Sequence, residues 1–347
     1  NITGKRMYVT GGIGAAYEGE QFTKDYHLPN DTAYAETCAS IGLIFFASRM
    51  LRLDKRSEYA DVMERALYNC VLAGMQLDGT RFFYVNPLEV LPGISGEAPS
   101  HKHALAQRPR WYACACCPPN IARLLGSLGR YTWSIEQDAV YCHLFVAGEL
   151  DLTEYANGKL QIETAYPNDG LIRFRFLPKE AAMRLTLAVR IPDWSHDTQL
   201  QRNGKNAIYE LRNGYAYISG DFKSDDMFDL QLDMSVKTIY PNSKIAADSG
   251  RVAFMRGPLV YCAEGMDNGG SVVNLRVKHD GQIISWYTDE LFGIETLQAQ
   301  GYSVHTGDAL YSSVRPEVTE YSITLIPYYA WGNRGLTEMR VWLPEIR

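Results

Sequence analysis

Apolar residues recur with a helical period along the first part of the chain. The clearest run covers residues 38–51, and a second covers 57–73 with apolar side chains at i, i+3, i+4 and i+7 spacing. A third run follows Pro118 and Pro119, which suit a first helical turn because the N–H that proline lacks would have no partner there. These patterns predict a helical region over residues 1–133.

The pattern changes beyond residue 133 to short runs in which apolar and polar residues alternate. Examples are residues 140–146, 172–176 and 183–191, and Asn-Gly pairs of the kind that form tight turns separate several of these runs. This pattern predicts an antiparallel β-sandwich. A further β-rich segment is expected from about residue 236 to the last residue.

Composition narrows the class of protein. The 347 residues are 46% hydrophobic and 21% charged, which is typical of a globular chain with two or three cores. The formal net charge is -6 and the basic residues are scattered, so we expect no nucleic-acid partner. The most apolar stretch, 41–51, is about half of the roughly 20 residues that cross a bilayer, so no membrane association is expected.

The cysteines point away from a disulfide framework. They are odd in number, and three of them stand within four positions: Cys38, Cys70, Cys114, Cys116, Cys117, Cys142 and Cys262. Clustered cysteines in a chain without a recognisable leader favour a metal site or a reactive thiol in a reducing compartment. We therefore predict a cytoplasmic location.

The sequence offers one candidate metal site. Glu36, Cys38, Cys116 and Cys117 supply the three thiolates and one carboxylate that zinc accepts in a tetrahedral site. Residues two apart on a helix point about 200° from each other, so Glu36 and Cys38 are expected where a helix begins and not on one helical face. Pro118 is expected to hold Cys117 in extended backbone.

The spacing of these residues also has a simpler interpretation. A Cys-Cys pair before a helix is often two small buried side chains, and a Glu-x-Cys sequence arises by chance. Spacing alone favours this interpretation. Even a genuine site with four protein ligands is more often structural than catalytic.

A glycine-rich stretch near residue 10 precedes two candidate acid/base residues. Thr10-Gly11-Gly12-Ile13-Gly14 lacks the Lys-Ser/Thr ending of a phosphate-binding loop. The glycines are expected to let the backbone pass close to a ligand, with Glu18 or Glu20 projecting into a site. A solvated loop charge is the alternative for both glutamates.

Several long strings together resemble the bacterial β-L-arabinofuranosidase family, glycoside hydrolase family 127. They are MYVTGGIG, GEQF, DYHLPNDTAYAETCASIGL, FFYVNPLE, CCPPNIARLLGSLG, RGPLVYCAE and YYAWGNRG, and they extend over nearly the whole chain. The resemblance implies part of an (α/α)6 catalytic barrel over residues 1–133, a first antiparallel β-sandwich over 134–236 and a second over 237–347. It also implies that family members carry about another half of the barrel ahead of this sequence, so that the chain is a C-terminal portion.

The resemblance also implies a set of site residues. Zn²⁺ would be held by Glu36, Cys38, Cys116 and Cys117, and Cys116 would also be the nucleophile of a retaining glycosidase. Glu20 would be the acid/base, and Tyr84 would line the sugar site. His27 stands where many relatives carry an acidic residue, and no role is assigned to it.

The function implied is the release of β-L-arabinofuranose from an oligosaccharide or glycoconjugate. Two alternatives stay open: a non-catalytic carbohydrate-binding or assembly module with a structural zinc, and a glycosidase that accepts a different sugar on the same scaffold. A homodimer is left open as well.

Overall fold

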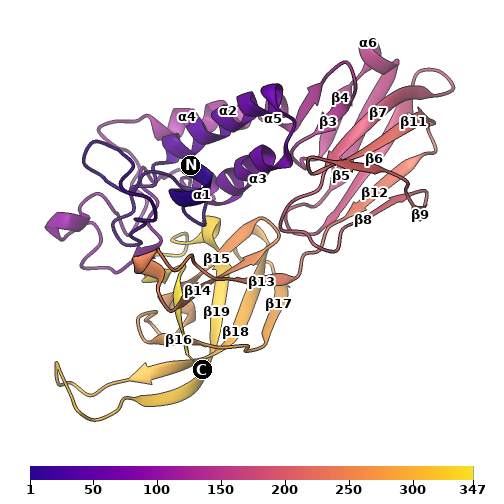
Figure 1. The fold of residues 1–347 in the computed structure, drawn as a ribbon. Coiled ribbons are helices and arrows are strands. Elements are labelled where there is room, and N and C mark those ends of the chain that lie inside the picture. The colour runs from indigo at the N-terminus through magenta and orange to yellow at the C-terminus, as the bar shows by residue number, and fades with distance from the viewer. Residues whose placement is uncertain (347) are drawn as a thin grey trace. The chain divides into compact units, whose positions relative to one another are not determined.

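The computed structural model describes residues 1–346 as a mixed α+β protein with three β-sheets (Figure 1). Its contacts divide the chain into two units. Unit 1 combines residues 1–42 and 65–121 with the chain from Val236 onward, and unit 2 combines Leu43–Glu64 with Ala122–Ser235. The prediction of a protein that contains both helices and β-sheets is confirmed.

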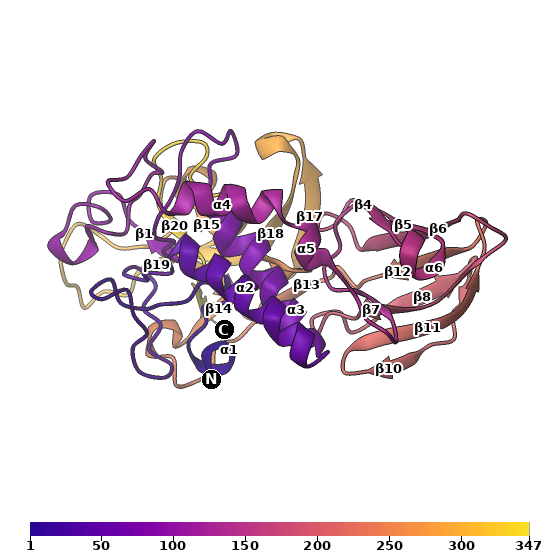
Figure 2. The ribbon, with the colours of Figure 1, turned by 90° about the horizontal axis from the view of Figure 1, so that it is seen from above.

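The predicted helical runs form helices with shifted ends. The run at 38–51 is α2 (Thr37–Leu53), and 57–73 is α3 (Ser57–Arg65) continued by the π-helical η1 (Ala66–Val71). The run after the two prolines divides into α4 (Cys117–Gly126) and α5 (Gly129–Thr132). In both views α4 runs beside α2 (Figure 1 and Figure 2). Two further short helices are α1 (Ile2–Lys5) and α6 (Thr153–Ala156).

Helix α4 begins at Cys117, before the two prolines after which it was expected. Cys117 is its first residue, so the expectation of extended backbone at Cys117 is wrong, and Pro118 and Pro119 occupy the first turn. The first turn tolerates both prolines because its N–H groups have no partners within the helix. None of the helices in residues 1–346 is long and apolar enough to span a membrane.

Unit 2 contains two of the sheets. One has the strand order β10-β11-β7-β3-β2 and the other β4-β5-β6-β12-β8-β9. Their strands are β2 (Trp133–Ile135), β3 (Val140–Cys142), β4 (Gly148–Asp151), β5 (Gly158–Thr164), β6 (Leu171–Pro178), β7 (Met183–Arg190), β8 (Gln199–Arg202), β9 (Lys205–Asn206), β10 (Glu210–Arg212), β11 (Tyr215–Phe222) and β12 (Met227–Gln231).

The alternating runs that form β5 and β6 bury one face of each of these two strands. Phe176 on β6 stacks on Phe222 of β11, with ring centroids 4.2 Å apart, so side chains of the two sheets meet. The strand predicted at 140–146 ends at Cys142. The next residue, His143, is buried, and its ring hydrogen-bonds to Ser134 and Tyr215.

Unit 1 contains a ten-stranded sheet with the order β1-β20-β15-β19-β18-β16-β21-β14-β13, in which β17 also pairs with β18. Its strands are β1 (Glu89–Val90), β13 (Val236–Ile239), β14 (Arg251–Arg256), β15 (Leu259–Glu264), β16 (Leu275–Lys278), β17 (Ile283–Thr288), β18 (Ile294–His305), β19 (Glu317–Pro327), β20 (Met339–Arg340) and β21 (Leu343–Ile346). Most neighbours are antiparallel, but β16 and β21 are parallel.

A buried aromatic group ties the N-terminal segments to this sheet. Trp331 stacks on Phe83 with ring centroids 4.8 Å apart. The Arg108 guanidinium lies 4.5 Å from the centre of the Phe83 ring and donates hydrogen bonds to the carbonyl oxygens of Ala73 and Trp331. These contacts fix the segment around Phe83, whose next residue is Tyr84.

Candidate metal and catalytic site

Four side chains that could donate to a metal ion lie together at the starts of α2 and α4, and all four belong to unit 1. Glu36 precedes α2 and Cys38 lies in its first turn, while Cys117 begins α4 and Cys116 precedes it. The Cys38 and Cys117 sulfurs are 3.5 Å apart, and Glu36 Oε1 lies 3.6 Å from the Cys116 sulfur. One donor atom from each residue lies within 4.8 Å of all the others, so this group of four could hold a metal ion.

The local fold holds this cluster through the backbone. The Thr37 N–H donates to the carbonyl oxygen of Tyr84, and its hydroxyl donates to that of Phe83. The buried Asn86 side chain donates to the Ala35 carbonyl oxygen and to the Thr37 hydroxyl, each at 2.9 Å. The segment that carries Glu36 is therefore joined to residues 83–86 by buried polar contacts.

The pKa values of the four side chains indicate that they are not all ionised together in the absence of a cation. Burial raises the pKa of Glu36 to about 7 and that of Cys116 to about 11. The hydrogen bond between the two sulfurs lowers the pKa of Cys38 to about 6 and raises the pKa of Cys117. The four groups can be ionised together only if a cation offsets their repulsion. Three thiolates and a carboxylate form a donor set that zinc accepts.

The predicted acid/base residue lies beside the cluster. Glu20 Oε1 accepts a hydrogen bond from the Tyr34 hydroxyl at 2.7 Å and one from the Tyr84 hydroxyl at 3.4 Å. Tyr84 also hydrogen-bonds to the thiol of Cys116. Burial raises the pKa of both tyrosines, so both stay neutral donors at ordinary pH. Tyr84 therefore bridges Glu20 and Cys116.

The structure thus brings together all the residues that the sequence assigns to the site. Glu20 is the carboxylate that the tyrosines contact; Glu18 is exposed, and its backbone oxygen accepts from Gln21. His27 is exposed, and its Nδ1 lies 2.7 Å from the Thr23 hydroxyl oxygen, a local contact within its own loop.

Two polar residues of the site were missed by the sequence reasoning. Tyr34 bonds Glu20, and the side chain of Asn120 hydrogen-bonds to Cys38. Both lie inside strings that already carry the metal ligands, DTAYAETC and CCPPN. Their position within a few residues of the candidate metal ligands was the signal that could have identified them.

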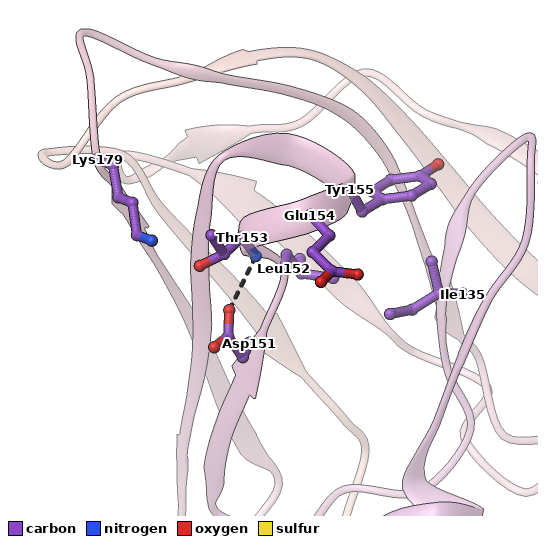
Figure 3. Close-up of a pocket in the computed structure, with 7 residues that line it drawn as sticks. All are labelled: Ile135, Asp151, Leu152, Thr153, Glu154, Tyr155 and Lys179. Carbon is purple, nitrogen blue, oxygen red and sulfur yellow. Dashed lines mark hydrogen bonds between the residues drawn. The ribbon is translucent and has the colours of Figure 1, made fainter.

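Unit 2 has a separate surface hollow of about 620 Å³. It is lined by Ile135, Asp151, Leu152, Thr153, Glu154, Tyr155 and Lys179 (Figure 3). The Asp151 carboxylate accepts a hydrogen bond from the Thr153 backbone N–H at 2.8 Å, which fixes the start of α6. The hollow contains none of the predicted site residues.

Comparison with known proteins divides the chain into three matched segments. Residues 1–130 match the model of the β-L-arabinofuranosidase GH127 catalytic domain, 139–234 the GH127 middle domain, and 236–344 the glycoside hydrolase family 127 C-terminal domain.

Relatives match over the full length of the chain. A non-reducing end β-L-arabinofuranosidase of Bifidobacterium longum is 41% identical over an alignment 360 residues long, which covers 99% of this chain and 54% of the relative. The structure of a GH127 β-L-arabinofuranosidase from Geobacillus stearothermophilus T6 superposes with a TM-score of 0.95 at 42% identity, covering 100% of this chain and 55% of that one. A second GH127 β-arabinofuranosidase structure gives a TM-score of 0.90 at 34% identity, again over 100% and 55% of the two chains. The chain therefore spans about half the length of these relatives.

Proposed function

Because the chain belongs to the β-L-arabinofuranosidase family, glycoside hydrolase family 127, we propose that it forms part of a retaining glycosidase that releases β-L-arabinofuranose from oligosaccharides or glycoconjugates. The observation that carries this proposal is the arrangement of Glu20, Tyr84 and Cys116. The Tyr84 hydroxyl contacts both the Glu20 carboxylate and the Cys116 thiol, so a proton donor and a nucleophile lie within reach of one substrate.

Zinc fits the donor set of the cluster. Glu36, Cys38, Cys116 and Cys117 would hold it, and the bound ion would keep the thiols ionised at neutral pH. Cys117 is fully buried, whereas Cys116 is partly exposed, so a substrate reaches the Cys116 sulfur more easily. This difference supports Cys116 as the nucleophile and Cys117 as a ligand only.

The proposed reaction has two displacements at the anomeric carbon. In the first, the Cys116 thiolate forms a C–S bond as the glycosidic C–O bond breaks, and Glu20 gives its proton to the departing oxygen. In the second, Glu20 takes a proton from water, whose oxygen attacks the same carbon while the C–S bond breaks. Tyr34 and Tyr84 orient the Glu20 carboxylate throughout.

We also propose the finer domain organisation, with part of an (α/α)6 barrel over residues 1–133 and β-sandwiches over 134–236 and 237–347. The three matched family segments, and the Phe176–Phe222 stack between the two sheets of unit 2, support this division. The described cysteines are all free, which supports the proposal of a cytoplasmic protein.

The second candidate is a carbohydrate-binding or assembly module with a structural zinc. Four protein donors fill a tetrahedral site and leave no position open, which is the usual form of a structural site and favours this candidate.

Trapping of the covalent intermediate tests the proposal. The full-length protein is treated with a mechanism-based arabinofuranosyl inhibitor, and the labelled peptide is located by mass spectrometry. We expect a thioglycosyl adduct on Cys116, with no adduct in Cys116→Ala. A label on Glu18, Glu20 or Glu36 would contradict the nucleophile, and an absence of both label and hydrolysis across a panel of nitrophenyl glycosides would favour the binding module.

A further inference from the structure

The acid/base residue shares a tight turn with an exposed aromatic residue. Ala16 and Gln21 exchange backbone hydrogen bonds of 3.2 and 3.3 Å, and the Glu20 N–H donates to the Tyr17 carbonyl oxygen at 3.1 Å. Gly19 has φ +75° and Glu20 has φ +48°, so the turn passes through left-handed backbone just where the carboxylate is carried. The turn therefore fixes Tyr17 and Glu20 relative to each other.

The Tyr17 ring is supported by a second ring, and more than half of the residue is exposed. It stacks on the His103 ring with centroids 4.7 Å apart and an interplanar angle of 11°. The His103 ring is itself held, because its Nε2 lies 3.1 Å from the Thr32 carbonyl oxygen. Tyr17 is nevertheless 55% exposed, so much of its side chain is accessible to a ligand.

A row of tyrosine rings connects Tyr17 to the surroundings of Glu20 and Cys116. Tyr84 contacts both Cys116 and Glu20, and its ring centroid is 6.1 Å from that of Tyr34. The Tyr34 ring centroid is in turn 5.9 Å from that of Tyr17. The thiolate attacks from one side of the anomeric carbon, and the departing oxygen receives its proton from Glu20 on the other. A sugar that departs beside Glu20 has Tyr34 and Tyr17 as its nearest aromatic rings in this row.

We propose that the Tyr17–His103 stack is a binding platform for the sugar that leaves in the first displacement. This inference rests on the proposed function and adds to it a subsite beyond the scissile bond. Sugars present C–H faces that pack on aromatic rings, and a ring already held by a second ring loses little freedom on binding. The turn keeps this platform in register with the carboxylate that protonates the leaving oxygen.

The test compares two substrates with the same arabinofuranosyl group on the full-length protein. One carries a second sugar as the leaving group, and the other carries only a methyl group, which is too small to reach the platform. In Tyr17→Ala, the ratio of kcat/KM for the disaccharide to kcat/KM for the methyl glycoside is expected to fall about ten- to thirtyfold, as loss of one aromatic contact surface implies. Tyr17→Phe keeps the stack and should keep the ratio.

Two further variants make the result specific. His103→Ala removes the support and should lower the same ratio by a smaller factor. Tyr311→Ala changes a tyrosine that is 88% exposed on the loop between β18 and β19, and it should leave the ratio unchanged. Circular dichroism checks that each variant is folded.

Each result decides the matter. A selective loss on the disaccharide supports the platform. An equal loss on both substrates, or no loss on either, overturns it and leaves the proposed function standing. Failure of the wild-type protein to cleave either substrate overturns the proposed function, and the platform with it.

Discussion

Each unit of this protein contains a buried group of acidic side chains, and the two groups differ in how their charge is offset. In unit 2, Glu64 and Asp61 face the fully buried guanidinium of Arg190. Glu64 also accepts hydrogen bonds from the Tyr166 hydroxyl and, at 3.0 Å, from the Trp194 indole N–H. The protein itself therefore supplies the cation and the neutral donors.

The cluster in unit 1 has no such internal partner. Within the described residues, Glu36 forms no ion pair with a lysine or an arginine, and its nearest polar neighbours include the thiols of Cys116 and Cys117. A buried anion needs an offsetting charge or a proton. The first group is therefore complete as folded, whereas full ionisation of the second calls for a cation from outside the chain, such as a metal ion.

Removal of the Arg190 guanidinium, the buried cation of unit 2, should have the largest effect on stability. Arg190→Met leaves Glu64 and Asp61 buried without their partner, and breaking a buried ion pair in this way costs about 3–5 kcal/mol of unfolding free energy. Urea unfolding measures the loss. Arg184→Met is the control, because Arg184 pairs with Asp221 at the exposed surface and its loss should change little. Equal losses in both variants would contradict the account of unit 2.

Removal of a metal ion from the cluster of unit 1 should have the second-largest effect on stability. A chelator is expected to lower the stability of the wild-type protein by about 3 kcal/mol, as loss of a ligand present at a hundredfold excess over its dissociation constant would. Thermal unfolding with and without chelator measures the shift.

Two cysteine variants locate the origin of that shift. Cys38→Ser should abolish the response to chelator, whereas Cys142→Ser, at a buried cysteine of unit 2, should keep it. If the response disappears in both variants, or in neither, the metal that the chelator removes is not bound specifically by the cluster.

The smallest expected effect is a loss of stability in acid through His143, and it should not depend on a bound metal ion. Burial lowers the pKa of His143 in unit 2 to about 3, so between pH 6.5 and 3 the unfolded chain binds a proton that the folded chain does not. Stability through His143 is therefore lost as the pH falls, by at most about 1.4 kcal/mol per pH unit. Asp61 acts in the opposite sense below pH 6, because burial raises its pKa to about 6 and the folded chain binds the extra proton.

A variant isolates the histidine contribution. His143→Gln should become more resistant to acid than the wild-type protein, and chelator should not alter this difference. Urea unfolding at pH 7, 5.5 and 4.5 provides the measurement. Parallel stability curves for the two proteins would show that His143 does not carry a buried, neutral imidazole.

The sequence predicted the parts of the fold that depend on local pattern. Helix α2 follows from apolar periodicity, and the placement of Glu36 and Cys38 at its start follows from the angle between residues two apart. The identity of the site residues came from long strings that resemble a family, because spacing alone favoured buried small side chains. The contacts of Glu20 with Tyr34 and Tyr84 then place these residues in one site.

The rest depends on contacts between residues far apart in the chain. Arg190 meets Glu64 across 126 positions, and neither residue stands in a recognisable motif. The parallel pairing of β16 with β21 likewise has no local signal, because register is decided by the whole sheet. Cys117 became helical against the local preference imposed by Pro118, which shows tertiary structure overriding a backbone rule.

The zinc content of the purified full-length protein tests the central claim most directly. The unbalanced cluster of unit 1 predicts about one zinc ion per chain in the wild-type protein and in Arg184→Met, and a large loss of zinc in Cys38→Ser. A wild-type protein that is free of metal, folded and active in the presence of chelator would contradict the account.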